Sequence, residues 1–196
     1  MIDQIAGPLP AARSARRFHV AELTRQYHPR LIQALYNLIN GGLTIGLLAG
    51  VAHLTSSPFI FPSLGATAFI LFSSPKARSA SPRNILLGHL TGATTGWASL
   101  VLFGLLDAPP ALVSGVDWPR IGAVALSVGA TGALTLLLDA PHPPAGATTL
   151  IVSLGLMPHL WQIPVLMTAV LLLTAQGFVI NRVAGIGHPL WDRADD

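Results

Sequence analysis

The 196-residue sequence is 52% hydrophobic and only 10% charged, and its mean hydropathy is +0.61. Soluble domains carry about a quarter charged residues, so this composition excludes an ordinary soluble protein and indicates a polytopic membrane protein. The absence of cysteine excludes a disulfide framework. The net charge of +3 comes mainly from arginines in the N-terminal tail and one loop. This distribution indicates orientation in a membrane rather than nucleic-acid binding.

Residues 1–30 form a basic N-terminal tail without an apolar run. A cleaved signal peptide needs an apolar core of about 7–15 residues, so this tail is not one. Residues 14–30 fit two structures: a basic helix lying on anionic headgroups, or a solvated cytoplasmic tail. The arginines of the tail are Arg13, Arg16, Arg17, Arg25 and Arg30.

Residues 31–106 contain the first group of membrane segments. Residues 31–54 are long enough to cross about 30 Å of hydrocarbon, and residues 84–106 form another full span. Between them the apolar helix 63–74 is only roughly 18 Å long at 1.5 Å per residue, so it cannot cross alone. Preceded by the extended residues 56–61 it can cross, provided that this irregular backbone is buried in protein or lines a cavity.

A second group of segments follows a Pro-rich connection at residues 107–120. The full spans are predicted at 121–138 and 163–180. A second broken segment lies between them, with its lead-in at 139–143 and its helix at 145–157. The sequence therefore divides into a basic tail, a first membrane repeat, a connecting loop, a second membrane repeat and a C-terminal tail: 1–30, 31–106, 107–120, 121–182 and 183–196.

The two broken segments match each other in sequence. Residues 62–70 align with residues 143–151, and both contain the pattern P-x-x-G-A-T followed by apolar residues. Proline suits the first helical position, where its missing N–H has no partner in any case. At the same spacing, glycines of the flanking helices also coincide: Gly41 with Gly122, and Gly96 with Gly177. The chain reads as two copies of one unit.

The distribution of cations favours six membrane crossings over four. With six crossings, both termini and the loop carrying Lys76, Arg78 and Arg83 lie on one side, and only Arg120 stays on the other. Three crossings per repeat make the second repeat inverted relative to the first, as in many transporters. We therefore predict an all-α membrane protein with six segments in two inverted repeats, the second and fifth being half-helices, and with both termini in the cytoplasm.

The N-terminus of each half-helix is a candidate anion site. Free backbone N–H groups and the helix dipole favour a negative ligand there, without any buried lysine or arginine. The alternative is a proline kink between packed helices, in which the small residues only allow close packing. The predicted substrate-binding residues are Ser63, Leu64, Gly65, Ala66 and Thr67 in the first copy, and His142, Ala145, Gly146, Ala147, Thr148 and Thr149 in the second.

Polar residues in or near the spans are functional candidates by default. His53, Asn84 and His89 are therefore candidates for gating or for the transport pathway, whereas His142 suits packing or gating better than the role of a base. Asp139 fits a local cap. We expect no metal site and no cofactor, because no H-x-x-x-H or H-E-x-x-H pattern occurs and the spans lack carboxylates.

Three blocks in order resemble the HPP family of integral membrane proteins: residues 61–67, residues 82–89 and His142-Pro143-Pro144-Ala145-Gly146-Ala147-Thr148. The resemblance covers roughly residues 31–185. Members in cyanobacteria and chloroplasts are linked to nitrite transport, which the resemblance implies as the function here. The family is usually described with four spans, and hydropathy counting is expected to miss the two broken segments.

The leading hypothesis is a transporter or channel for a small inorganic anion, with nitrite as lead substrate. The alternatives are a membrane-embedded sensor or assembly subunit without transport activity, and an intramembrane enzyme, which is disfavoured because no catalytic set is evident. The expected location is a bacterial inner (plasma) membrane, and the expected partners are the anion and the lipid bilayer. We also expect a homodimer or other homo-oligomer, because a small bundle covers irregular backbone poorly, and no binding of nucleic acid.

Overall fold

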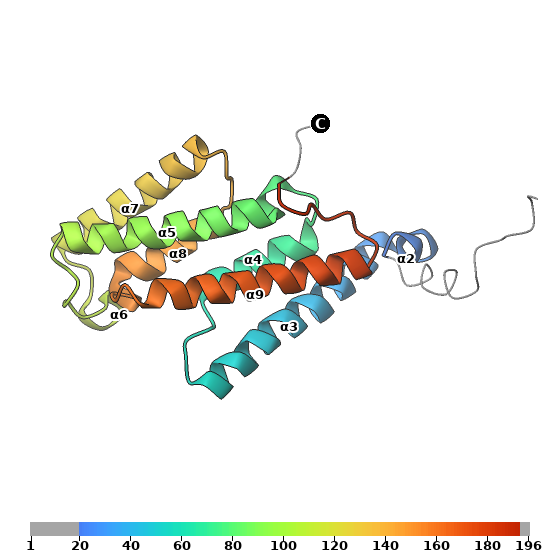
Figure 1. Ribbon diagram of the computed structural model, residues 1–196, viewed down its shortest axis with the longest axis horizontal. Helices are drawn as coiled ribbons and strands as arrows, with labels where there is room; N and C mark the ends of the chain where they lie inside the picture. Colours follow the sequence, from blue (N-terminus) through green and yellow to red (C-terminus); the bar gives the residue numbers. More distant parts are fainter. Residues whose placement is uncertain (1–19, 193–196) are drawn as a thin grey trace, which may run out of the picture.

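The structure, a computed structural model, describes residues 20–192, which form a helical bundle (Figure 1). Within these residues four helices are long and apolar enough to cross a membrane: α3 (Pro29–Thr55), α5 (Pro82–Leu102), α7 (Trp118–Leu137) and α9 (Gln162–Val183). Two shorter apolar helices are α4 (Pro62–Ser73) and α8 (Pro144–Ile151). The remaining helices are α2 (Val20–Gln26), α6 (Ala111–Ser114), a 3-10 turn at Arg78–Ala80 and a wide turn at Val152–Leu156 that continues α8.

Most helices begin where proline or a capping side chain predicts. Pro29, Pro62 and Pro144 occupy the first positions of α3, α4 and α8, where a missing N–H costs nothing. Helix α5 is capped by Ser81, whose hydroxyl accepts from the Asn84 N–H, and α7 by the Asp117 carboxylate. Because α7 begins before residue 121, Arg120 belongs to its first turn and is buried.

Three long helices end in the same left-handed turn. The Leu105 N–H donates to the Leu100 carbonyl across Gly104, which has a φ of 66° and so ends α5 at Leu102. The prediction of a span to residue 106 is therefore too long. Helix α9 ends in the same way at Gly185, and α7 at Asp139, a non-glycine residue with a φ of 48°.

The two short helices both follow irregular backbone. Residues 56–61 precede α4, and residues 138–143 precede α8. In the bundle α4 and α8 run from the middle towards opposite ends (Figure 1), and they contact each other. The predicted helix 145–157 is divided into α8 and the wide turn at Val152–Leu156. Gly155, with a φ of 82°, turns the chain at the end of this second part.

Helix α5 lies at the centre and packs against α7, α8 and α9. Its small residues allow this closeness. A Cβ added at Gly88 would lie 2.7 Å from the His142 Cβ, and one at Gly92 only 2.5 Å from the Ala145 carbonyl oxygen. The glycines of α5 thus place α8 and its lead-in directly against the central helix.

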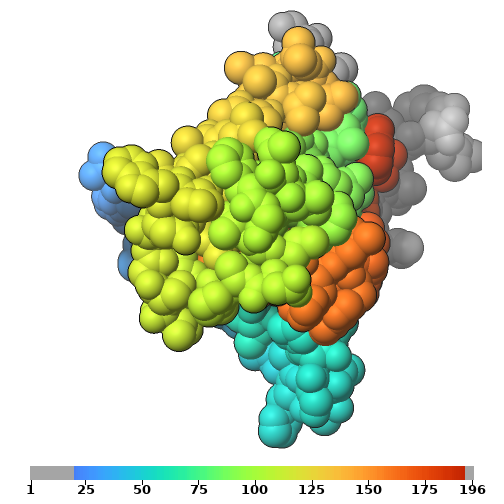
Figure 2. All heavy atoms as spheres, turned by 90° about the vertical axis from the view of Figure 1, so that its left-hand side faces the viewer, coloured from blue at the N-terminus to red at the C-terminus, as the bar shows by residue number. Residues whose placement is uncertain are grey.

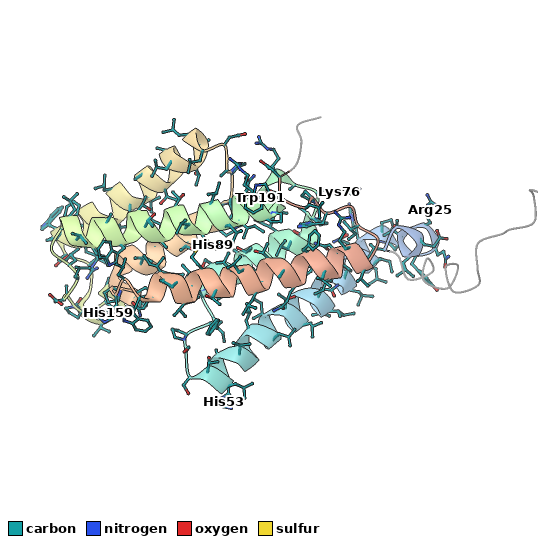
Figure 3. All side chains as sticks on the ribbon, in the orientation of Figure 1. Arg25, His53, Lys76, His89, His159 and Trp191 are labelled. Atoms are coloured by element: carbon teal, nitrogen blue, oxygen red, sulfur yellow. The ribbon has the colours of Figure 1, made fainter. Side chains whose placement is uncertain are left out.

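The cationic loops gather at one end of the bundle. Arg25 and Lys76 lie towards that end, whereas His159 lies at the opposite end and His53 at the end of α3 that points away from Arg25 (Figure 3). Seen from the end at which His159 lies, the C-terminal part of α3 projects from the bundle (Figure 2), in agreement with the exposure of most of its residues.

Candidate functional site

A buried polar centre lies where the N-terminal parts of α4 and α8 approach each other. Four polar side chains from three elements and one lead-in meet there: Thr67 of α4, His89 of α5, His142 before α8 and Thr148 of α8. All four are between 0% and 3% exposed. We refer to these four residues as the imidazole–hydroxyl cluster.

His89 lies between two threonines. Its Nε2 is 2.8 Å from the Thr67 Oγ1, and its Nδ1 is 2.7 Å from the Thr148 Oγ1. Thr67 and Thr148 are the threonines of the two P-x-x-G-A-T segments. One imidazole therefore bridges the equivalent hydroxyls of both segments.

His142 completes the cluster from the other side. Its Nδ1 is 2.8 Å from the Ser79 carbonyl oxygen, and its Nε2 is 3.1 Å from the Thr67 Oγ1 and 3.2 Å from the His89 Nε2. The two imidazole rings meet edge to face, with centroids 4.9 Å apart. The missing side chain at Gly88 leaves the space in which His142 lies.

The hydrogen bonds fix where the ring protons lie when both imidazoles are neutral. A carbonyl only accepts, so the His142 Nδ1 donates to Ser79 and the His142 Nε2 is a bare acceptor. Placing the His89 proton on Nε2 avoids two bare lone pairs facing each other, and it lets the Thr148 hydroxyl donate to the His89 Nδ1. Every ring nitrogen then has a partner.

The predicted backbone donors are less available than the sequence suggests. The N–H groups of Leu64, Ala145 and Gly146 already donate to carbonyl oxygens in their own turns, at 2.9 to 3.1 Å. Gly65 and Ala66 lie on the exposed face of α4. The buried polar side chains, rather than these amide groups, are therefore the main polar groups of the centre.

The predicted substrate-binding residues divide into two groups. One group is buried at or beside the cluster: Ser63, Leu64, Thr67, His142, Ala145, Thr148 and Thr149. The other is half-buried or exposed: Gly65, Ala66, Gly146 and Ala147. The Ser63 hydroxyl is buried and has no hydrogen-bond partner.

Of the three pathway candidates, only His89 joins the cluster. His53 lies near the exposed end of α3, well apart from His89 at the projecting end of that helix (Figure 3). Asn84 is buried, but its amide donates to the Arg78 carbonyl and its oxygen accepts from Arg83, so it holds the loop before α5.

A groove of about 290 Å³ reaches the cluster from α7. His142 contributes to its wall. Most of the remaining wall is apolar or carries small side chains and hydroxyls: Val128, Thr131, Gly132, Thr135, Leu136, Pro141, Pro143, Ala145 and Gly146. Among residues 20–192 no group of three or more histidine or acidic side chains suits a metal ion.

A family model of the HPP transmembrane region matches residues 26–189, which include both short helices and the whole imidazole–hydroxyl cluster. The chain belongs to the HPP family. With its four long apolar helices, this HPP chain is an integral membrane protein.

Two curated relatives of the HPP chain are transmembrane proteins of Dictyostelium discoideum. One is 30% identical over 135 residues, or 66% of this chain and 44% of the relative. The other is 33% identical over 93 residues, or 47% of this chain and 27% of the relative. The chain thus matches less than half the length of each of these relatives. No solved structure matches it.

Three polar contributions in this HPP chain were not predicted from its sequence. Ser79 acts through its backbone carbonyl, which no side-chain pattern reports. Thr131 links the Thr149 and Thr95 hydroxyls, at 2.7 and 2.6 Å, and its polar character inside an apolar span was the available signal. Arg120 is 2% exposed and donates to the Ser153 and Pro109 carbonyl oxygens, so it holds the end of α8.

Proposed function

We propose that this HPP chain is a transporter or channel for a small inorganic anion, with nitrite as lead substrate. The observation that supports this most is the imidazole–hydroxyl cluster, which lies where the N-terminal parts of two short helices approach each other. Helix N-termini and hydroxyl donors favour an anion, and neither α4 nor α8 carries a charged side chain. Multiple weak donors suit passage, because an ion must also leave.

The proposed architecture has two inverted repeats. Equivalent contacts support it: Gly96 of α5 packs against Val152, and Gly177 of α9 packs against Leu71. The spacing that separates the two P-x-x-G-A-T segments also separates Gly96 from Gly177 and Leu71 from Val152. The glycine of each copy therefore packs against the aliphatic residue of the other copy. Exchange of this kind is what a two-fold relation between repeats produces.

The same proposal counts six crossings. Helix α4 has 12 residues, or roughly 18 Å at 1.5 Å per residue, and needs its lead-in to reach the other surface. Lys76, which follows α4, lies at the same end as Arg25 (Figure 3), as the positive-inside bias requires.

We further propose that the functional unit is a homodimer and that the protein has no catalytic activity.

The test is anion uptake by purified protein in liposomes. Nitrite, nitrate, formate and chloride are supplied outside, and uptake is compared with that of protein-free liposomes. We expect saturable uptake of nitrite that nitrate inhibits. Thr168 on α9 provides a control, because its hydroxyl is exposed and bonds only to its own helix; the Thr168→Val protein should transport normally. A sensor or assembly subunit would show no uptake of any anion.

A further inference from the structure

We infer that His89 and His142 together bind one exchangeable proton, and that this proton accompanies the anion through the protein. The inference rests on the proposed function and adds the coupling ion to it. It follows from the closeness of the two Nε2 atoms, 3.2 Å apart, in a site where both rings are buried.

The cluster has room for one added proton. A proton arriving at the bare Nε2 of His142 gives that ring two N–H donors, of which Nδ1 keeps Ser79 as its acceptor. His89 then adopts its other tautomer, donates from Nδ1 to the Thr148 oxygen and offers a bare Nε2 to His142. A second proton would place two cationic rings in direct contact, which like-charge repulsion disfavours.

No other full charge lies in this centre among residues 20–192. Helices α4 and α8 carry no titratable side chain, and α7 carries only Arg120, which is engaged near the end of α8. The groups on the loops and helix ends beside the cluster form ion pairs at the cationic end: Arg78 with Asp139 at 2.6 Å, and Arg83 with Asp192 at 3.2 Å. Lys76 lies on the same loop as Arg78.

This isolation makes the proton and the anion mutually dependent. A lone charge buried away from water is costly, whether it is an imidazolium or an anion, whereas a neutral pair costs much less. The O–H bond of a hydronium ion in the groove breaks and an N–H bond forms at the His142 Nε2, with water released. The reverse step on the other side returns the proton to solution with the anion.

Nitrate is a better probe of this coupling than nitrite. Nitrous acid, the protonated form of nitrite, crosses lipid unaided, whereas nitrate stays ionised. Proteoliposomes containing a pH-sensitive dye are loaded with potassium, and the voltage is clamped with valinomycin. We expect one proton to enter with each nitrate, and uptake to respond to the pH gradient but not to the clamped voltage. Nitrate entry without protons, at a rate that follows the voltage, would overturn the inference.

The decisive variant is His142→Asn, because the asparagine amide keeps the donor to Ser79 while the base at Nε2 is lost. We expect nitrate uptake to fall about tenfold or more, and the remaining uptake to carry no protons. His159→Asn is the matched control, since His159 lies in an exposed turn at the opposite end; its coupling should be unchanged. Unchanged coupling in His142→Asn would contradict the inference.

A second measurement separates this inference from the proposed function. In protein labelled with 15N-histidine, magnetic resonance follows the ring nitrogens of His89 and His142 as the pH is lowered. If no anion is transported but the pair takes up one shared proton, the proposed function is wrong and the proton site remains. If the two rings titrate independently and bind two protons, the inference is wrong, whatever the transport result.

Discussion

A single hydroxyl holds each side of the His89 ring. Thr148→Val removes the donor to Nδ1 with little change in shape, and it leaves a buried acceptor unpaired. We expect the free energy of unfolding to fall by about 1–3 kcal/mol, measured by chemical denaturation in detergent. Thr168→Val, at an exposed threonine, should change it by less than about 0.5 kcal/mol.

If Thr67→Val and Thr148→Val both fold and move nitrite at the normal rate and affinity, the hydroxyls do not contribute to the site.

We expect His188 to make the stability of the C-terminal segment depend on pH. Burial lowers the pKa of His188 below its usual 6.5; the hydrogen bond to the Pro75 carbonyl opposes this shift and the nearby Arg182 adds to it. Between the lowered pKa and 6.5 the unfolded segment binds more protons than the folded one, so stability is complete above pH 6.5 and decreases as the pH falls through the lowered pKa.

The measurement is amide hydrogen exchange of residues 184–192. We expect faster exchange at pH 5 than at pH 7.5, after correction for the intrinsic rate. His188→Asn keeps a donor for the Pro75 carbonyl but has no titratable ring, so its corrected exchange should not vary with pH. A wild-type profile that is equally flat would show that His188 does not control this segment.

At the scale of elements, the contact between α5 and α8 depends on the absence of side chains. A Cβ at Gly92 would meet the Ala145 carbonyl oxygen at 2.5 Å, and backbone yields less readily than a side chain. We expect Gly92→Ala to lower the free energy of unfolding by about 1–3 kcal/mol.

Gly129 of α7 is the matched control for this prediction, since an added Cβ there meets nothing within 4 Å. Alanine is the better helix former, so Gly129→Ala should leave stability unchanged or raise it by up to about 1 kcal/mol. Thermal unfolding of both proteins in the same detergent makes the comparison. Equal effects of the two substitutions would show that α5 and α8 are not closely packed.

The short helices were predictable because their starts carry local signals. Pro62 and Pro144 fix the first turns, and both helices start within one residue of the predicted positions, although α8 ends earlier than predicted. The end of α5 was missed, because Gly104 stops it within a run that remains apolar. The pairing of His89 with His142 was not predictable, since it joins positions far apart in the sequence and is aimed by the backbone carbonyl of Ser79.

At the scale of the whole molecule, the six-crossing proposal assigns a side to each loop. The chain has no cysteine, so a single cysteine reports its own location. We expect Lys76→Cys to be labelled by a membrane-impermeant maleimide from the cytoplasmic side only, and His159→Cys from the other side only. Labelling of both variants from the same side would contradict six crossings.

The exposed face of α3 leads us to expect a second copy of the chain there. Gly42, Gly46 and Gly50 recur every fourth residue, and an added Cβ at any of them meets nothing within 4 Å. Small residues at this spacing suit close helix pairing in membranes, and a copy on α3 would also cover the irregular residues 56–61 that follow it.

The mass of the protein in mild detergent tests this assembly. Light scattering corrected for bound detergent should give two copies per particle. Gly46→Leu should yield monomers, whereas Gly129→Leu, at an open position on α7, should remain dimeric. A wild-type monomer that still transports nitrite would contradict the predicted dimer.

In the proposed two-repeat architecture, the bridge formed by His89 gives the two repeats unequal shares in one centre. At the spacing that relates the P-x-x-G-A-T segments, the counterpart of His89 is Val170, a buried apolar residue of α9. In the proposed repeat relation, both copies therefore carry the threonine, and only the first copy carries a histidine beside it. For a transporter of the proposed architecture, the two faces of the membrane would not be interchangeable, and we expect inward and outward flux to differ in rate even when the same gradient is reversed.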